Sequence, residues 1–384
     1  MKKLLLLASY VVSTVLFVIF SYGFVDKNLV LSNNPLYLGL HGWLSALAFN
    51  ERPLVTGIYL VFLVIFFVLY AWAYRMTKRR ELRGRDIILT VAVTYGILVF
   101  AYSLVSYDIF NYMTTAKMLF THHENPYIVM PIEIPNEASL AFTRAANKVA
   151  LYGPTWLLLS GIPHVLGFGN VWLTMISFKL FVTLWLIGGL YLIYKVTHQW
   201  QAVILFGLNP LILIEIVVSG HNDIVMMVLA LLGLHLLQKS SVVDKLIGWK
   251  ALALSILVKG ATAVLIVPLL LKLKGNKLYR MSFWLLFAVF IIFTPLREEL
   301  YPWYAVWFFL FAVVMPSDIA WFEQGLTIAF SIGLELRNLP YMFMGYYAGP
   351  GPTLRTLLTV VPVGLYVVWS LRMKRNSLWN GKKT

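Results

Sequence analysis

The sequence predicts an all-α polytopic membrane protein, and three observations support this fold class. Hydrophobic residues make up 60% of the 384 residues, charged residues only 12%, and the mean hydropathy is +0.80. In a soluble domain roughly a quarter of all residues are charged, so this composition excludes a soluble protein. Several apolar runs reach about 20 residues, the length that a helix needs to cross a bilayer. The absence of cysteine excludes disulfides, thiolate metal sites and a cysteine nucleophile.

Three apolar runs open the chain and predict the first three spans. The loop 75–85 after the second run carries six basic residues, a clustering typical of the cytoplasmic face. No small-x-small cleavage site follows the first run, so it is predicted to be a span and not a cleaved signal peptide. The three runs are residues 4–24, 54–74 and 87–107.

Residues 108–152 are too polar to cross the bilayer and predict a large external loop. Two patterns in this loop place apolar residues on one face of a helix. Amphipathic helices of this kind lie flat at the membrane interface. The first pattern is Ile109, Met113, Ala116 and Phe120, and the second is Ala138, Phe142, Ala145 and Val149.

The rest of the chain alternates apolar runs with short polar loops. One run must be re-entrant, because the lysines between 239 and 250 should be cytoplasmic. We assign this role to 153–169, a short run that Gly161 and Pro163 interrupt. The runs are residues 153–169, 171–194, 202–218, 224–237, 251–271, 281–295, 303–314, 326–336 and 356–370.

The run 251–271 contains Lys259-Gly260 at its centre and has basic residues on both flanks, so it predicts a broken hairpin whose tip points outward. Such breaks occur at membrane depth where the backbone lines a cavity or is buried in protein. The prediction is then one domain, residues 1–384, with about 12 transmembrane helices and both termini in the cytoplasm. The net charge of +15 lies mainly on cytoplasmic loops, so it indicates orientation and gives no evidence for nucleic acid.

Asp108 is the sharpest chemical feature, because it places a carboxylate at the outer end of a span. A carboxylate there is close enough to the bilayer to meet the headgroup of a lipid substrate, and it suits a general base. The alternative is an interfacial aspartate that caps the following helix.

His123 and Glu124 form a second candidate, as ligands of a divalent cation, Mg²⁺ or Mn²⁺. Such a cation would neutralise a substrate phosphate. Adjacent histidines in a loop are also explained by ordinary hydrogen bonding and solvation, and this reading stays open.

A third group is Glu215 with the segment Gly220-His221-Asn222-Asp223, between two apolar runs. Ionisable groups at such depth are costly and usually line a polar cavity. Helix capping by Asn222 or Asp223 is the alternative, but it does not account for Glu215. Lys259 in turn is a candidate phosphate ligand, since no leaflet-charge rule requires a lysine on the outer side.

Together these segments resemble the GT-C superfamily of polytopic glycosyltransferases, in particular its polyprenyl-phosphate-mannose-dependent mannosyltransferases. The resemblance rests on an ordered set of short motifs across residues 108–304. The motifs are Asp108-Ile109-Phe110-Asn111-Tyr112, Asn125-Pro126-Tyr127, Tyr152-Gly153-Pro154, Asn209-Pro210, Gly220-His221-Asn222-Asp223, Lys259-Gly260 and Pro302-Trp303-Tyr304.

The resemblance implies a GT-C-like bundle and an inverting transfer of a sugar, most simply mannose, from a polyprenyl phosphate to a glycolipid or glycan. It places the enzyme in a prokaryotic plasma membrane, with the site on the extracytoplasmic face and Asp108 as the base. It leaves the metal open, because some relatives use a divalent cation and others use none. The substrate-binding residues expected on this basis are Tyr112, Asn125, Tyr127, Tyr152, Glu215, His221, Asn222, Asp223, Lys259, Arg297, Trp303 and Tyr304.

Two alternatives remain at this stage. A transporter or flippase of a lipid-linked or small polar substrate would use Glu215, Asp223 and Lys259 to line a path, but no inverted repeat is visible. A donor that carries arabinose or glucose fits the same fold, because hydroxyl contacts set the choice of sugar.

Overall fold

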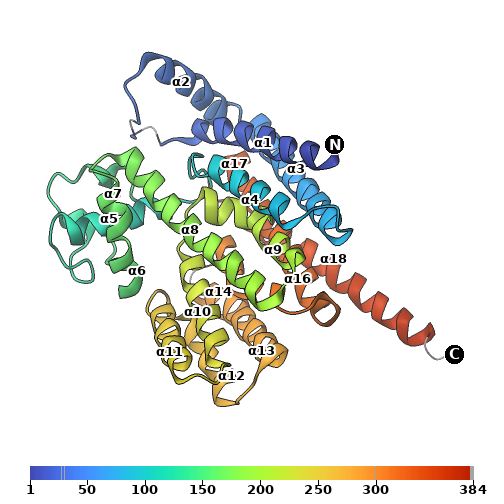
Figure 1. Cartoon of the computed structure of the whole chain (residues 1–384). Coiled ribbons are helices and arrows are strands. Elements are labelled where there is room, and N and C mark those ends of the chain that lie inside the picture. Colours follow the sequence, from blue (N-terminus) through green and yellow to red (C-terminus); the bar gives the residue numbers. More distant parts are fainter. Residues whose placement is uncertain (27, 30, 298, 381–384) are drawn as a thin grey trace.

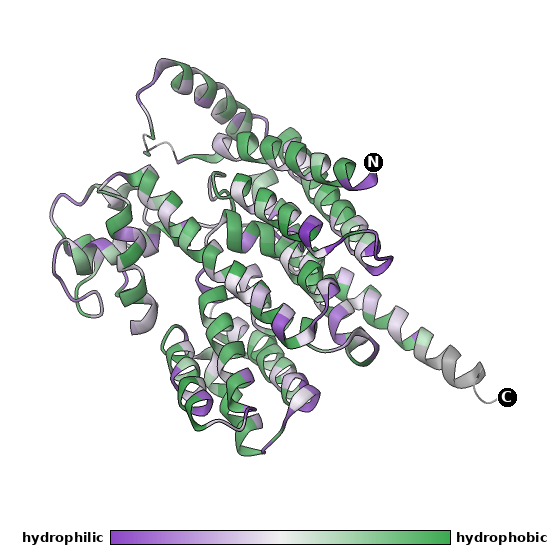
Figure 2. Cartoon of the chain, in the orientation of Figure 1, coloured by the Kyte–Doolittle hydropathy of each residue, from purple (hydrophilic) through white to green (hydrophobic). Residues whose placement is uncertain are grey.

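The computed structural model describes residues 1–26, 28–29, 31–297 and 299–380, without the side chains of 297 and 374–380. Within these ranges the chain is helical and contains no β-strand (Figure 1). Most helical surfaces are apolar, and polar residues concentrate at the N-terminus and in the connecting loops (Figure 2). The all-α class is therefore confirmed, and the apolar helices indicate an integral membrane protein.

Five helical segments are long and apolar enough to cross a membrane, within the described residues. A sixth candidate is a pair of helices, α9 and η4, which meet at 69°. The predicted number of about 12 crossings and the re-entrant segment 153–169 stay predictions, since several runs form helices shorter than the ~30 Å that a crossing needs. The five segments are Lys2–Phe24, Arg52–Lys78, Val171–Thr197, Gly275–Leu296 and Gly351–Met373.

The third predicted span, 87–107, is wrong in its second half. Helix α4 (Gly84–Leu98) ends early, and residues 99–107 form turns that lead into α5 (Asp108–Phe120). Polar groups from other segments support these turns: Lys179 of α8 (Val171–Thr197) donates to the carbonyl of Ala101, and Ser103 Oγ donates to Val218 O at 3.0 Å. The early end of α4 lets Asp108 begin a new helix.

The first amphipathic pattern in the loop 108–152 forms α5, as predicted. Its residues Ile109, Met113 and Ala116 are buried against the rest of the protein. The second pattern is wrong as a helix, because only one 3₁₀ turn, η3 (Ala138–Ala141), forms there. The N–H of Ala145 donates to Asn111 Oδ1 of α5 instead of to a helical carbonyl, and the Thr143 hydroxyl bonds to that of Thr114.

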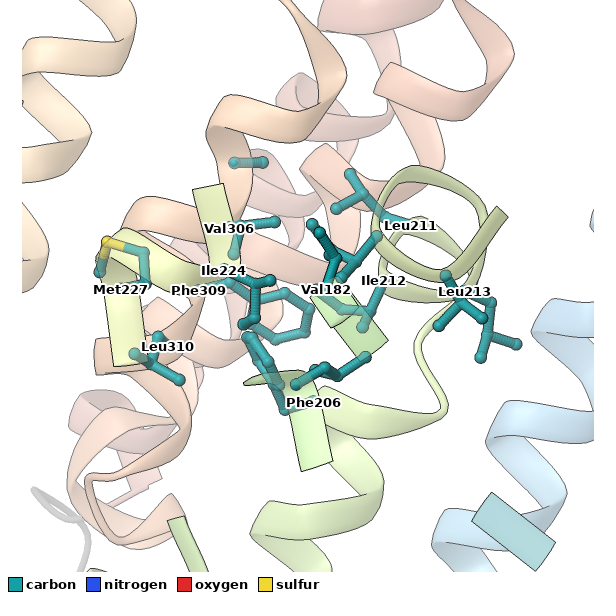
Figure 3. Packing of buried hydrophobic residues seen from close by; sticks show 14 of the residues in the cluster. Val182, Phe206, Leu211, Ile212, Leu213, Ile224, Met227, Val306, Phe309 and Leu310 are labelled. Atoms are coloured by element: carbon teal, nitrogen blue, oxygen red, sulfur yellow. The ribbon is translucent and has the colours of Figure 1, made fainter. Parts of the chain in front are cut away.

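Helices that are far apart in the sequence enclose the core. α9 (Trp200–Gly207), α10 (Asp223–Leu237) and α15 (Val306–Val313) meet there, and the rings of Phe206 and Phe309 pack edge-on at 5.3 Å, with Met227 at the margin of the same cluster (Figure 3). Gly233 lets α10 lie close to α11 (Val242–Ile256), since a Cβ there would be 2.9 Å from Gly248 O.

The segment 108–152 lies on one side of the molecule, and both termini lie toward the other (Figure 1). The remaining elements are α1 (Lys2–Ser21), η1 (Tyr22–Phe24), α2 (Pro35–Asn50), α3 (Arg52–Lys78), η2 (Pro131–Glu133), α6 (Pro154–Leu159), α7 (Gly161–Leu166), η4 (Ile212–Val218), η5 (Gly260–Leu265), α12 (Ile266–Leu270), α13 (Gly275–Ala288), η6 (Val289–Phe293), α14 (Thr294–Arg297), η7 (Pro302–Ala305), α16 (Ser317–Leu336), α17 (Leu339–Met344) and α18 (Gly351–Asn380).

Candidate active site

The structure brings Asp108, Glu215, His221, Asp223 and Lys259 into one polar cluster. They come from the start of α5, from η4, from the loop after η4, from the start of α10 and from the residue before η5. His221 links the first two carboxylates, and Lys259 pairs with the third. Asp108, the group from Glu215 to Asp223, and Lys259, which the sequence suggested separately, therefore lie in one cluster.

The backbone around His221 is not a regular helix. η4 is a π-helix, a rare form that occurs mostly at functional sites. It ends at Val218, and two residues later Gly220 has a φ of +75°, a conformation that residues with a Cβ rarely adopt. Glu215 and Asn222 are therefore not on one face of a continuous helix, and His221 turns back onto Glu215.

His221 is fully buried and its hydrogen-bond partners define its tautomer. Nδ1 lies 2.7 Å from the carbonyl oxygen of Glu215, which can only accept, so Nδ1 carries the hydrogen. Nε2 then accepts from Ser106 Oγ at 3.0 Å, and Asp108 Oδ2 lies 3.9 Å from Nε2. The ring stacks on Trp303 at a centroid distance of 3.9 Å.

Asp108 is the acid of this cluster that a substrate can reach. Its side chain is 25% exposed, against 1% for Glu215 and 0% for Asp223. Its backbone N–H donates to Ser106 Oγ at 3.3 Å, and Asn111 Nδ2 donates to Oδ1 at 3.5 Å. Burial raises the pKa of Asp108, although the nearby His221 and Lys259 oppose this effect. A carboxylate with a raised pKa is a stronger base.

Both carboxylate oxygens of Asp223 are engaged. Lys259 Nζ lies 2.7 Å from Oδ2, and Trp307 Nε1 donates to Oδ1 at 2.6 Å. Lys259 also lies over the rings of Tyr152 and Tyr304, 5.9 Å and 5.2 Å from their centroids. The lysine at the helix break is thus fixed by one carboxylate and two aromatic rings.

The motif Tyr152-Gly153-Pro154 links the external segment by backbone hydrogen bonds to the residues directly before Lys259. Gly153 N donates to Val258 O at 3.0 Å, and Thr155 N donates to Leu257 O at 3.1 Å. A Cβ at Gly153 would overlap the Leu257 carbonyl, so only glycine fits. The motif is more than a turn, because it fixes the backbone that carries Lys259.

Tyr112 and Asn222 connect α5 to the start of α10. Tyr112 OH donates to Asn222 Oδ1 at 3.3 Å, and its ring meets that of Tyr152 edge-on at 4.7 Å. Asn125 and Tyr127 lie farther out: Asn125 Oδ1 accepts from Tyr127 N, and Tyr127 OH donates to Tyr152 O at 2.8 Å. These two residues contact the cluster through Tyr152.

His123 and Glu124, the predicted metal ligands, are both exposed. His122 beside them bonds instead to Glu137, with Nε2 2.9 Å from Oε2, and Lys117 Nζ donates to Oε1 at 2.9 Å. The described residues include no group of three or more His, Cys, Asp or Glu that could hold a metal ion. Metal binding at His123 and Glu124 stays a prediction, and no step below uses it.

Arg297, a predicted ligand, has its side chain outside the described part of the structure. Two residues later, Glu299 pairs with Arg337 at 2.7 Å and with Arg355 at 3.1 Å. This network leads to η7, whose Trp303 stacks on His221. Trp303 and Tyr304 therefore contact residues of the cluster, and their binding of substrate stays a prediction.

Sequence reasoning missed Ser106, Trp307, Glu335 and Tyr59. Glu335 is fully buried in α16 and accepts a hydrogen bond from Tyr59 OH at 3.2 Å. An isolated acid in an apolar run was a usable signal for Glu335. Ser106 and Trp307 carried no such signal, because their partners are distant in sequence.

Several buried polar atoms around His221 have no hydrogen-bond partner. Most buried polar groups are paired, so each exception asks for an explanation. Glycosidic and hydroxyl groups of a bound ligand would supply both donors and acceptors. The atoms are Asn222 Nδ2, Trp303 Nε1, Glu215 Oε2 and Glu335 Oε1.

The fold and the cluster define a membrane-embedded enzyme, in which an accessible carboxylate is supported by a buried histidine. Residues 11–274, more than half of the chain, match the family described as alpha-(1->6)-mannopyranosyltransferase, N-terminal domain, and the chain belongs to this family. Neither a curated protein nor a solved structure matches it. The family confirms the predicted resemblance to membrane mannosyltransferases, and the match contains Asp108, His221 and Lys259.

Proposed function

We propose that this protein is an inverting mannosyltransferase that uses a polyprenyl-phosphate donor. The family supports mannosyl transfer, and the position of Asp108 supports the mechanism. Asp108 is the exposed acid of a cluster whose other acids are buried. This single observation carries the assignment of Asp108 as the base.

In the proposed reaction an acceptor hydroxyl gives its proton to Asp108 and its oxygen attacks the anomeric carbon. The bond from that carbon to the phosphate oxygen breaks, and polyprenyl phosphate leaves with the electron pair. One direct displacement inverts the configuration. A positioned base contributes about 10²- to 10⁴-fold to such a step.

Lys259 is the proposed ligand of the donor phosphate. Asp223 engages one of its three N–H donors, so the others remain for a phosphate oxygen. Fixed positive charge stabilises the negative charge that develops on the leaving group. Arg297 stays in the proposal as a second phosphate ligand, on sequence grounds alone.

The unpaired Asn222 Nδ2 and Trp303 Nε1 are the proposed contacts to sugar hydroxyls. Tyr112 and Tyr152 line the same region and support Asn222. Buried donors that a ligand hydroxyl satisfies discriminate strongly against sugars that lack this hydroxyl. Choice among mannose, glucose and arabinose would arise here.

The donor would enter from the bilayer, with the site on the extracytoplasmic face of a prokaryotic plasma membrane and both termini inside. The arginine-rich loop between α3 and α4 supports this orientation. The acceptor would be a glycolipid or glycan. The family favours this transfer over the alternative of a transporter or flippase.

The test is to incubate purified protein with polyprenyl-phosphate mannose, glucose and arabinose and to detect the glycosylated product and its anomeric configuration. We expect transfer of mannose with inversion, and loss of transfer in Asp108→Asn. The matched control is Asp318→Asn, at an exposed aspartate in the first turn of α16. Unchanged turnover by Asp108→Asn would remove this residue from the mechanism.

A further inference from the structure

His221 lies between two carboxylates and is oriented toward one of them. Its Nδ1–H is held by the Glu215 carbonyl, and its Nε2 faces Ser106 Oγ at 3.0 Å and Asp108 Oδ2 at 3.9 Å. The carboxylate oxygen Oε2 of Glu215 lies 3.2 Å from Nδ1 and accepts no hydrogen bond. A neutral histidine in this position can take up a proton, and the Glu215 carboxylate lies close enough to balance the resulting positive charge.

We propose that His221 accepts the proton that Asp108 removes from the acceptor, with Glu215 as the counter-ion of the resulting imidazolium. The inference rests on the proposed function and adds two positioning residues to it. Both act through Asp108, because neither reaches an exposed surface.

The proton balance of this relay is simple. The acceptor O–H bond breaks and the proton moves to Asp108 Oδ2, which passes it to His221 Nε2 once these two atoms, 3.9 Å apart in this structure, approach to hydrogen-bond distance. Asp108 is again a carboxylate, and His221 carries one positive charge beside the negative charge of Glu215. After the product leaves, the proton returns through Asp108 to water, because Asp108 is the exposed end of the pair.

Four charged groups face His221 from the elements packed around it: Asp108 on α5, Glu215 on η4, Asp223 on α10 and Lys259 before η5. Lys259 and Asp223 neutralise each other at 2.7 Å. Trp303 covers one face of the ring, and Ser106 Oγ contacts Nε2. Glu215 is therefore the acid in position to stabilise a charged His221.

The relay predicts a specific change in the pH dependence of kcat/KM. Protonation of either Asp108 or His221 blocks the relay, so both groups compete for the same inhibiting proton. Two such coupled groups bind this proton at a higher pH than either group alone. In His221→Gln the acidic limb should move to lower pH, by about 0.3 unit if the two groups share the proton equally, and kcat should fall by about 10²-fold. Glu215→Gln removes the counter-ion and should move the limb in the same direction.

The experiment compares these two variants with wild type and with His235→Gln, a histidine at the other end of α10. Thermal unfolding in detergent establishes that each variant is folded. If His221→Gln does not fold, the isosteric variant Glu215→Gln tests the relay instead. A lower kcat with an unshifted acidic limb in a folded variant would overturn the relay, because a structural role alone gives that result. Wild-type enzyme that transfers no sugar from any polyprenyl phosphate would overturn the proposed function, and the relay with it.

Discussion

Lys259 and Asp223 join the helix break before η5 to the start of α10 by an ion pair, with Nζ 2.7 Å from Oδ2. Asp223 is fully buried, and its other oxygen accepts from Trp307 Nε1. A buried carboxylate that loses its cationic partner is strongly destabilising. The pair thus holds the fold together at the point where the phosphate ligand is proposed.

Lys259→Met should lower the free energy of unfolding by about 3 kcal/mol, because Asp223 is left buried without a cation. The double variant Lys259→Met/Asp223→Asn should recover most of that loss, since no uncompensated charge remains. Thermal unfolding in detergent measures both values. Transfer activity should stay low in the two variants, because neither supplies a cation to the phosphate. Equal instability of the single and double variants would show that the pair is not the cause.

Gly153→Ala should impair both stability and transfer. The added Cβ overlaps the Leu257 carbonyl and pushes the segment that carries Lys259. Overpacking of this kind costs about 1–3 kcal/mol. Gly96→Ala on α4 is the matched control, since a Cβ there meets no atom within 4 Å. If the two variants have the same Tm and kcat, the contact of Gly153 with Leu257 does not position the lysine.

Glu137 should make the external segment sensitive to acid. Burial alone would raise the pKa of its carboxyl, but hydrogen bonds from Lys117, Ser139 and His122 lower it to about 2. Because this pKa is depressed, Glu137 stabilises the fold fully at a pH above the ordinary pKa of a glutamate carboxyl. This contribution is lost as the pH falls toward about 2.

Hydrogen exchange of residues 108–152 measures this effect. Protection in wild type should decrease as the pH is lowered through that window, after correction for the intrinsic exchange rate. Glu137→Gln should show weaker protection at neutral pH and less dependence on pH, because it carries no charge to lose. Equal profiles for the two proteins would show that the Lys117 and His122 bonds do not order the segment.

The long helices were predictable because each depends on its own apolar residues: α1, α3 and α8 lie within or around predicted spans. The end of α4 at Leu98 could not be predicted from the local sequence, because the turns that follow are supported by Lys179, a residue far along the chain. The failed helix after Ala138 has the same cause, since its polar groups bond to α5.

For the site, the sequence likewise predicted which residues are unusual, but it did not predict which of them contact one another. Asp108, His221 and Lys259 stood out because charged groups near membrane depth are costly. Pairing Asp223 with Lys259 and Trp307 requires the packing of α10 against α15, which no local pattern encodes. The tautomer of His221 likewise follows from the π-helical turn that brings the Glu215 carbonyl to Nδ1.

Trp303 separates two roles, since it stacks on His221 and also offers an unpaired Nε1. Trp303→Phe keeps an aromatic ring against the imidazole but removes the donor. If Nε1 binds a sugar hydroxyl, this variant should raise KM for the donor by about tenfold, the value of one hydrogen bond, and leave kcat nearly unchanged. Trp303→Ala removes the stack as well and should also lower kcat, because His221 is no longer held toward Asp108. Steady-state kinetics with polyprenyl-phosphate mannose resolves the two parameters, and a kcat loss in Trp303→Phe equal to that in Trp303→Ala would refute the division.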